Sequence, residues 1–364
     1  MNEVNEFVVR RKLTRPIKIG GVVVGGDAPI RVQSMTDTDT RDVPSTIAQI
    51  RRLEEAGCEI VRVAVPDMEA ARAIREIKAG ISIPLIADIH FDHRLALAAI
   101  KAGADAIRIN PGNIGGNDRV LKVIHAAKDR GIPIRIGVNA GSLPKDIAEK
   151  YCHPYPMALV ESALRHIHLF EEAGFYDIKL SLKASDVPTT VAAYRMISEK
   201  VDYPLHLGVT EAGPLLPGSI KSALAIGILL SEGIGDTIRV SLSADPVEEV
   251  KVAYEILKGL KIRLRGPEII ACPGCGRAEI DMTAFTALLE RRLEEAGIKE
   301  PIKVALMGCV VNGPGEAKEA DVGIAAGKGK GALFEKGKVV DHIKVEEMIE
   351  ALIKRAKELS ELKP

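Results

Sequence analysis

The chain has 364 residues, of which 46% are hydrophobic and 27% charged, a composition typical of a globular protein with an ample core. Its 50 basic and 50 acidic residues balance, so overall charge predicts no attraction to nucleic acid or to a membrane. The N-terminus mixes acids and bases without an apolar core, and no apolar run could span a bilayer, so we expect a cytoplasmic protein. Five cysteines in so long a chain favour metal or redox chemistry over a disulfide framework.

Short strand-like runs alternate with helical patterns through the first two thirds of the chain. Residues 15–29, RPIKIGGVVVGGDAP, predict a small hairpin that could close the floor of a barrel. The amphipathic stretches between the later runs often end in glycine, as helices with a C-cap do. Eight runs rich in β-branched residues follow the hairpin, at 30–35, 59–65, 84–90, 106–110, 134–139, 177–183, 204–209 and 237–242.

Eight alternating units in roughly 250 residues match the size of a (β/α)8 TIM barrel. A doubly wound open sheet is the alternative, but it rarely needs so many regular units. Beyond residue 261 the pattern changes to CPGCGR, two helical segments and the strand-like IKVALMG, which predict an α+β module of about 100 residues. We therefore expect a substrate-binding barrel at 1–262 and a smaller cysteine-bearing domain at 263–364.

Polar residues occupy the carboxyl ends of the predicted strands, where a barrel carries its chemistry. Four arginines and a lysine outnumber the acids there, and a buried guanidinium is costly unless an acid or an anionic ligand satisfies it. Structural pairing with Asp88 and Glu211 is one interpretation; a small ligand with several phosphate charges is the other. No phosphate-binding glycine loop and no basic-aromatic pattern for nucleic acid is present. The candidate lining residues are Arg62, Asp88, Arg108, Asn110, Arg135, Asn139, Lys183, His206, Arg239 and Ser241.

Three cysteines of the C-terminal part have metal-ligand character. Cys272 and Cys275 form a C-x-x-C pair, and Cys309 begins a turn-rich loop, GCVVNGPGEA, that brings Glu316 back toward it. A structural zinc is the commonest interpretation of such a pair. Three thiolates with one weak oxygen ligand would instead suit an iron–sulfur cluster whose fourth position can be vacated.

CPGCGR and GCVVNGPGEA, preceded by VQSMTDTDT at 32–40, strongly resemble the bacterial 4-hydroxy-3-methylbut-2-en-1-yl diphosphate synthase family over nearly the whole chain. The resemblance implies a 4Fe–4S cluster held by Cys272, Cys275, Cys309 and Glu316. It also implies reduction of 2-C-methyl-D-erythritol 2,4-cyclodiphosphate in isoprenoid biosynthesis, with two electrons from flavodoxin or ferredoxin. These two electrons would be consumed in opening the ring and removing the C3 hydroxyl.

Glu211, in GVTEAG after the seventh run, is the predicted catalytic acid, because a leaving hydroxyl requires a proton. The last barrel helix should end at the floor, away from the mouth, so we predict a head-to-tail homodimer in which each cysteine domain caps its partner's barrel. A pteroate synthase-like transferase with a structural metal, and an electron carrier on a barrel scaffold, are the alternatives. Cys58 and Cys152 are expected to have no functional role.

Overall fold

The computed structural model describes residues 9–151, 156–309, 315 and 317–362, and the chain divides into two compact units, one ending at Arg263 and one beginning at Leu264. Within the described ranges, no helix combines the length and apolar character needed to cross a lipid bilayer.

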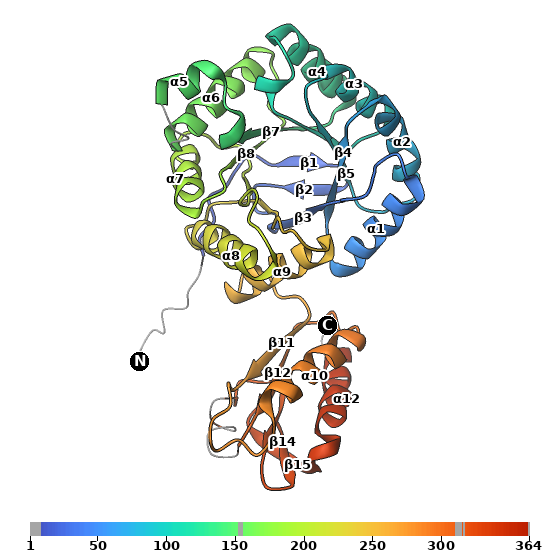
Figure 1. Ribbon diagram of the computed structural model, residues 1–364, viewed down its shortest axis with the longest axis vertical. Coiled ribbons are helices and arrows are strands. Elements are labelled where there is room, and N and C mark those ends of the chain that lie inside the picture. The colour runs from blue at the N-terminus through green and yellow to red at the C-terminus, as the bar shows by residue number, and fades with distance from the viewer. Residues whose placement is uncertain (1–8, 152–155, 310–314, 316, 363–364) are drawn as a thin grey trace. The chain divides into compact units, whose positions relative to one another are not determined.

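The first unit is an eight-stranded barrel ringed by helices, as predicted (Figure 1). Every neighbouring pair of its strands is parallel, and a bridge between Leu180 and Leu205 joins the two ends of the sheet. The strands are β3 Arg31–Met35, β4 Ile60–Val65, β5 Leu85–Ile89, β6 Ala106–Ile109, β7 Ile134–Asn139, β8 Ile178–Lys183, β9 His206–Leu207 and β10 Thr237–Ile238. The helices are α1 Val43–Ala56, α2 Met68–Ala79, α3 His93–Ala102, α4 Asn117–Arg130, α5 Lys145–Tyr151, α6 Pro156–Glu172, α7 Val187–Ser198, α8 Leu215–Ser231 and α9 Pro246–Gly259.

The predicted extents of the seventh and eighth strands, 204–209 and 237–242, are wrong. β9 and β10 contain two residues each, and Gly208, directly after β9, has a φ of +153°, which glycine adopts readily. The two segments nevertheless stay aligned, since the Arg239 amide donates to the Leu207 carbonyl at 3.0 Å. Residues 239–241 therefore keep their place at the carboxyl end of the barrel although they lie outside the strand.

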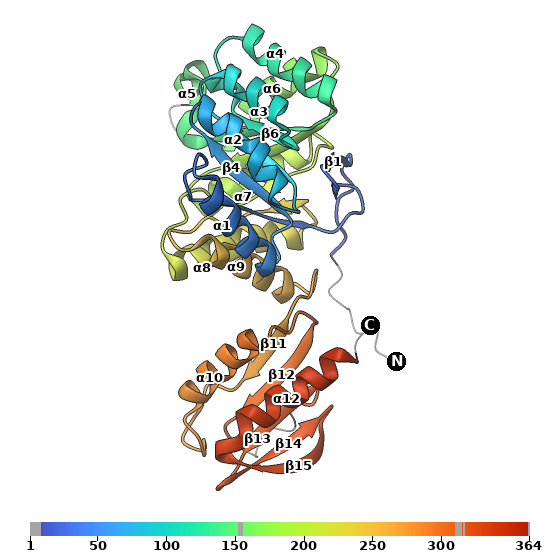
Figure 2. The same ribbon diagram turned by 90° about the vertical axis from the view of Figure 1, so that its right-hand side faces the viewer.

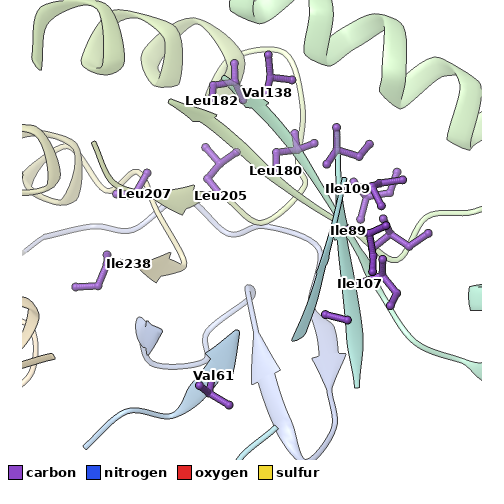
Figure 3. Packing of buried hydrophobic residues seen from close by; sticks show 14 of the residues in the cluster. Val61, Ile89, Ile107, Ile109, Val138, Leu180, Leu182, Leu205, Leu207 and Ile238 are labelled. Atoms are coloured by element: carbon purple, nitrogen blue, oxygen red, sulfur yellow. The ribbon is translucent and has the colours of Figure 1, made fainter. Parts of the chain in front are cut away.

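The main core lies between the strands and the surrounding helices. Alternate residues of each strand point outward and pack against the apolar faces of those helices. Figure 3 shows members of this cluster, among them Ile107, Leu180 and Leu207. Because the β-branched and leucine side chains are used on the outer face, the inner face is left for other residues.

A hairpin of β1 Ile17–Ile19 and β2 Val22–Val24 closes the floor of the barrel, as predicted. Its apolar side chains form a separate cluster with Ile60, Ile86 and Ala106, which face inward near the start of their strands. The apolar filling of the barrel therefore stops near the floor.

The second unit is an α+β module, also as predicted (Figure 2). Its sheet has the order β11-β12-β13-β14-β15, with the first three strands parallel and the last two antiparallel to their neighbours. Helices α10 Met282–Glu295 and α12 Met348–Glu361 pack on one sheet face, where Leu289 and Leu352 meet Val304 and Ile324. The strands are β11 Pro267–Ala271, β12 Ile302–Met307, β13 Val322–Ala326, β14 Lys330–Glu335 and β15 Lys338–Lys344.

Candidate active site

The inner face of the barrel above the floor is polar, whereas most TIM barrels fill it with branched apolar side chains. Strand alternation places polar residues on this face, and most are at least nine-tenths buried. Cations outnumber the acids that face them. The buried members are Arg62 on β4, Asp88 on β5, Arg108 on β6, Arg135 on β7, Lys179 and Lys183 on β8, and His206 on β9.

Asp88 is the acid at the centre of this group. Its carboxylate accepts a hydrogen bond from Arg108 Nη1 at 3.0 Å and lies 3.5 Å from Arg62 Nε. The same Arg108 nitrogen is 2.7 Å from His90 Nε2. Burial alone would raise the pKa of Asp88, but attraction to Arg62, hydrogen bonding to His90 and attraction to Arg108 hold that pKa well below its ordinary value. Asp88 is therefore an ionised counter-ion, not a proton donor.

Arg239 has its own acid, one that the sequence reasoning did not identify. Its Nη2 lies 3.3 Å from Glu249 Oε1, and Glu249 also accepts hydrogen bonds from Ser34 Oγ and the Leu242 amide. Glu249 belongs to α9, so no feature of the strand ends pointed to it. The structural pairing considered for the arginines thus holds for Arg62, Arg108 and Arg239, although Glu211 has no part in it.

Arg135 and Lys183 have no carboxylate within 4.0 Å among the described residues. The Nε and Nη1 atoms of Arg135 are buried without a hydrogen-bond partner there. Burial and repulsion from Arg62 and Arg108 lower the pKa of Arg135 well below its ordinary value. A guanidinium keeps its proton in proteins, so the lowered pKa reflects a buried charge that an anionic ligand would stabilise.

Two glycines make room for these cations. A side-chain Cβ at Gly137 would lie 2.5 Å from Arg108 Nε, and one at Gly208 would lie 2.3 Å from the Arg239 carbonyl oxygen and 2.7 Å from Lys183 Nζ. Both positions face the interior, where the other strands carry long side chains. The glycines therefore leave space in which the Arg108 and Lys183 head groups can lie.

His206 is fully buried among the cations. Its Nδ1 is 2.8 Å from Thr237 Oγ1, and its Nε2 has no partner among the described residues. Burial, with repulsion from Arg135 and Lys183, lowers its pKa well below the ordinary value. A neutral His206 can donate or accept a hydrogen bond at Nε2 without adding charge.

The uncharged candidates lie at or beyond the ends of their strands. Asn110 is buried, accepts from the Gly112 amide at 3.1 Å and donates to Ser142 Oγ at 3.0 Å, so it also shapes the loop after β6. Asn139 and Ser241 are half-buried. These residues line the rim rather than the interior.

Glu211 lies in the loop between β9 and α8, and its side chain is exposed. It forms no hydrogen bond or ion pair with another residue in the described part of the chain. Its φ of +53° is in the left-handed region, which costs a non-glycine residue about 1 kcal/mol. Strained backbone of this kind often occurs at functional sites, where it re-aims a side chain.

The cysteines of the second unit lie beside two adjacent parallel strands. Cys272 directly follows β11, and Cys309 follows β12 by two residues. The Gly308 amide donates to Cys272 Sγ at 3.2 Å, which ties the two strand ends together. Cys275 is exposed in the loop that follows. Backbone N–H groups aimed at cysteine sulfur are a usual feature of thiolate-ligated centres.

Among the described residues, no three His, Cys, Asp or Glu side chains lie close enough together to hold a metal ion. The predicted ligand Glu316 and the loop cysteine Cys152 lie outside the described residues. Cys58 is buried in the barrel core and donates to the Ile60 carbonyl, and burial raises the pKa of its thiol to about 12.

Lys179 and Ser181 are interior residues that the sequence reasoning missed. They occupy the same face of β8 as Lys183, so the alternation of that strand contained the signal. The prediction considered only the carboxyl ends of the strands, so of these three residues it included Lys183 alone.

The fold and its polar interior place the chain among TIM-barrel enzymes with an appended α+β domain. Residues 14–254 match the family model described as GcpE TIM-barrel domain, and residues 268–358 match the GcpE protein C-terminal domain. The chain belongs to the GcpE family, which confirms the resemblance inferred from its motifs.

Curated relatives cover almost the whole chain. One from Thermodesulfovibrio yellowstonii is 61% identical over 95% of this chain and 99% of its own length. One from Caldanaerobacter subterraneus subsp. tengcongensis is 60% identical over 97% of this chain and 99% of its own. Both are named 4-hydroxy-3-methylbut-2-en-1-yl diphosphate synthase (flavodoxin).

Solved structures support the barrel alone. The dihydropteroate synthase of Yersinia pestis has a TM-score of 0.51 at 16% identity, covering 68% of this chain and 97% of its own. The N-acetylneuraminic acid synthetase of Leptospira borgpetersenii has a TM-score of 0.51 at 14% identity, covering 78% and 98%. Identities this low show a shared fold and carry no statement about activity.

Proposed function

We propose that the chain is a 4-hydroxy-3-methylbut-2-en-1-yl diphosphate synthase that acts on 2-C-methyl-D-erythritol 2,4-cyclodiphosphate. The names of relatives near 60% identity support this, and the observation that carries it is the surplus of buried cations inside the barrel. The cyclic dianion would take up two electrons and one proton. It would lose its C2–O(phosphate) bond and its C3 hydroxyl, giving the open diphosphate trianion and one water.

The diphosphate would lie between the cations that lack an acid. Arg135 presents its Nε and Nη1 atoms, which have no hydrogen-bond partner among the described residues, and Lys183 places its Nζ beside Gly208. Burial and repulsion from Arg135 lower the pKa of Lys183 well below its ordinary value, so an anionic ligand would stabilise its protonated form. Arg62, Arg108 and Arg239 are held in place by Asp88 and Glu249, so they can bind phosphate oxygens without further ordering. His206, Asn110, Asn139 and Ser241 would complete the lining with uncharged contacts.

Glu211 would supply the proton that leaves with the C3 hydroxyl as water. Its exposed carboxyl has no competing partner among the described residues, and its backbone has a φ of +53°, in the left-handed region that is often found at functional sites. A carboxyl placed beside the leaving hydroxyl can act as a general acid, because loss of that hydroxyl as water requires a proton.

The second unit would hold a 4Fe–4S cluster through Cys272, Cys275, Cys309 and Glu316. The residues present fit such a group: two thiols lie at adjacent strand ends, and a backbone amide is aimed at one sulfur. When bound, the cluster supplies electrons one at a time. We also propose a cytoplasmic location, because thiols that must serve as ligands are kept reduced there.

Flavodoxin is our proposed electron donor, since the relatives' names carry that word, with ferredoxin as the alternative. We further infer a head-to-tail homodimer. α9 follows the last barrel strand and, like other barrel helices, runs back toward the floor before the second unit begins at Leu264. A second copy could bring its cysteine unit to the mouth instead. α8 offers an apolar row of exposed side chains, Leu216, Ile220 and Leu224, typical of an interface.

A pteroate synthase-like transferase is not favoured, because the likeness to such enzymes is confined to the fold. Metal content separates the remaining possibilities. Purified without oxygen, the proposed enzyme should be brown and contain iron, whereas a structural zinc protein would be colourless. A bare electron carrier would be brown but would not convert the cyclic diphosphate in the presence of a chemical reductant.

A further inference from the structure

Lys179 is a second buried lysine inside the barrel, nearer the floor than Lys183 on the same strand. Its residue is 1% exposed. Its Nζ lies 3.5 Å from Gln33 Oε1 on β3, the outer limit of a hydrogen bond, and no carboxylate lies within 4.0 Å of it among the described residues. A buried ammonium without a counter-ion costs several kcal/mol, more than one weak hydrogen bond returns.

The groups facing Lys179 from the neighbouring elements are mostly cationic. Arg135 on β7 and Arg62 on β4 repel a charge there, and His206 on β9 is neutral. Asp236, before β10, attracts it but is already occupied: its oxygens accept from Thr14 Oγ1 at 2.9 Å and from the Leu205 amide at 2.8 Å. Burial and the two arginines accordingly lower the pKa of Lys179 well below its ordinary value.

We propose that Lys179 is a positioning residue of the anion site that is neutral in the empty barrel and gains a proton when a dianion binds on its mouth side. The inference rests on the proposed function only in assigning the anion to this barrel. The proton comes from solvent and joins the Lys179 amine, and no bond of the ligand breaks. A protonated Lys179 would also favour the open diphosphate over the cyclic one, because ring opening creates one more ionised oxygen.

The test measures protons taken up on binding, by titration calorimetry in two buffers of different ionisation enthalpy. The ligands are sulfate and the cyclic diphosphate, neither of which changes its own protonation near neutral pH. The parent should take up protons with both, and Lys179→Met should take up about one fewer per site, with a shallower fall of affinity as pH rises. Lys101→Met, at an exposed lysine of α3, should behave as the parent does.

Three results would overturn the inference: binding by the parent without proton uptake, an unchanged proton count in Lys179→Met, or loss of uptake only in Lys183→Met. A parent that binds without taking up a proton refutes the mechanism even if Lys179→Met does not fold. Uptake with sulfate but no binding of the cyclic diphosphate would leave the role of Lys179 standing and refute the proposed function.

Discussion

Replacing Arg135 by Met should lower the affinity for the ligand and raise the free energy of unfolding of the ligand-free protein. Arg135 is 2% exposed, and among the described residues its Nε and Nη1 have no hydrogen-bond partner and no acid lies within 4.0 Å of it. Each charge-assisted hydrogen bond to phosphate contributes roughly 1.5–3 kcal/mol. Because water can partly replace the lost contacts, we expect a net loss of about 2–4 kcal/mol, a Kd about 30- to 900-fold higher.

The free protein should respond in the opposite direction. Exchanging a buried charge for an apolar side chain of similar length commonly stabilises a protein by about 1–4 kcal/mol. Arg108→Met is the matched control, because Arg108 donates to Asp88 at 3.0 Å and its loss leaves that carboxylate with fewer partners. We expect Arg108→Met to lower the free energy of unfolding by about 2 kcal/mol or more.

Calorimetric binding of the cyclic diphosphate and urea unfolding of the free protein measure the two effects. The reasoning fails if Arg135→Met binds the ligand as tightly as the parent does. It fails as well if both arginine variants are equally destabilised without ligand, since Arg135 would then have a partner that offsets its charge.

Other variants test the remaining parts of the site. Cys309→Ser should abolish iron binding and turnover while Cys58→Ala retains both, and an iron-loaded, fully active Cys309→Ser protein would contradict the ligand assignment. Glu211→Gln should keep iron and substrate binding but lose most turnover in a steady-state assay; unchanged turnover would move the proton source elsewhere. Mixed Glu211→Gln and Cys309→Ser subunits should regain activity after exchange, and no rescue in demonstrated heterodimers would place the site within one chain. The lowered pKa of Asp88 contributes stability that is present above the unfolded value of about 3.9 and is lost as pH falls through the folded pKa. Urea unfolding of Asp88→Asn should therefore depend less on pH below about 5 than that of the parent, and equal slopes would refute the pairing.

The barrel was predictable because its strands carry β-branched or leucine residues on the face that meets the helices, as at Ile107 and Ile109. The floor hairpin was predictable for a similar reason, since Ile17 and Ile19 alternate with a polar residue. The short β9 was not, because the sequence does not reveal that Gly208 takes a φ of +153° there.

The site was predictable where charge appears in an apolar strand, as at Arg135 in IRIGVN. Partners contributed by other elements were not: Glu249 reaches Arg239 from α9, and only packing of that helix brings the two together. Only the structure therefore shows which arginines have no acidic partner among the described residues.

Anaerobic turnover of the cyclic diphosphate, with the electrons counted, tests the central claim most directly. Iron-loaded protein and a chemical reductant should yield (E)-4-hydroxy-3-methylbut-2-enyl diphosphate, with two electrons consumed and one water released per molecule. Recovery of unchanged cyclic diphosphate from protein with a full complement of iron would contradict the account.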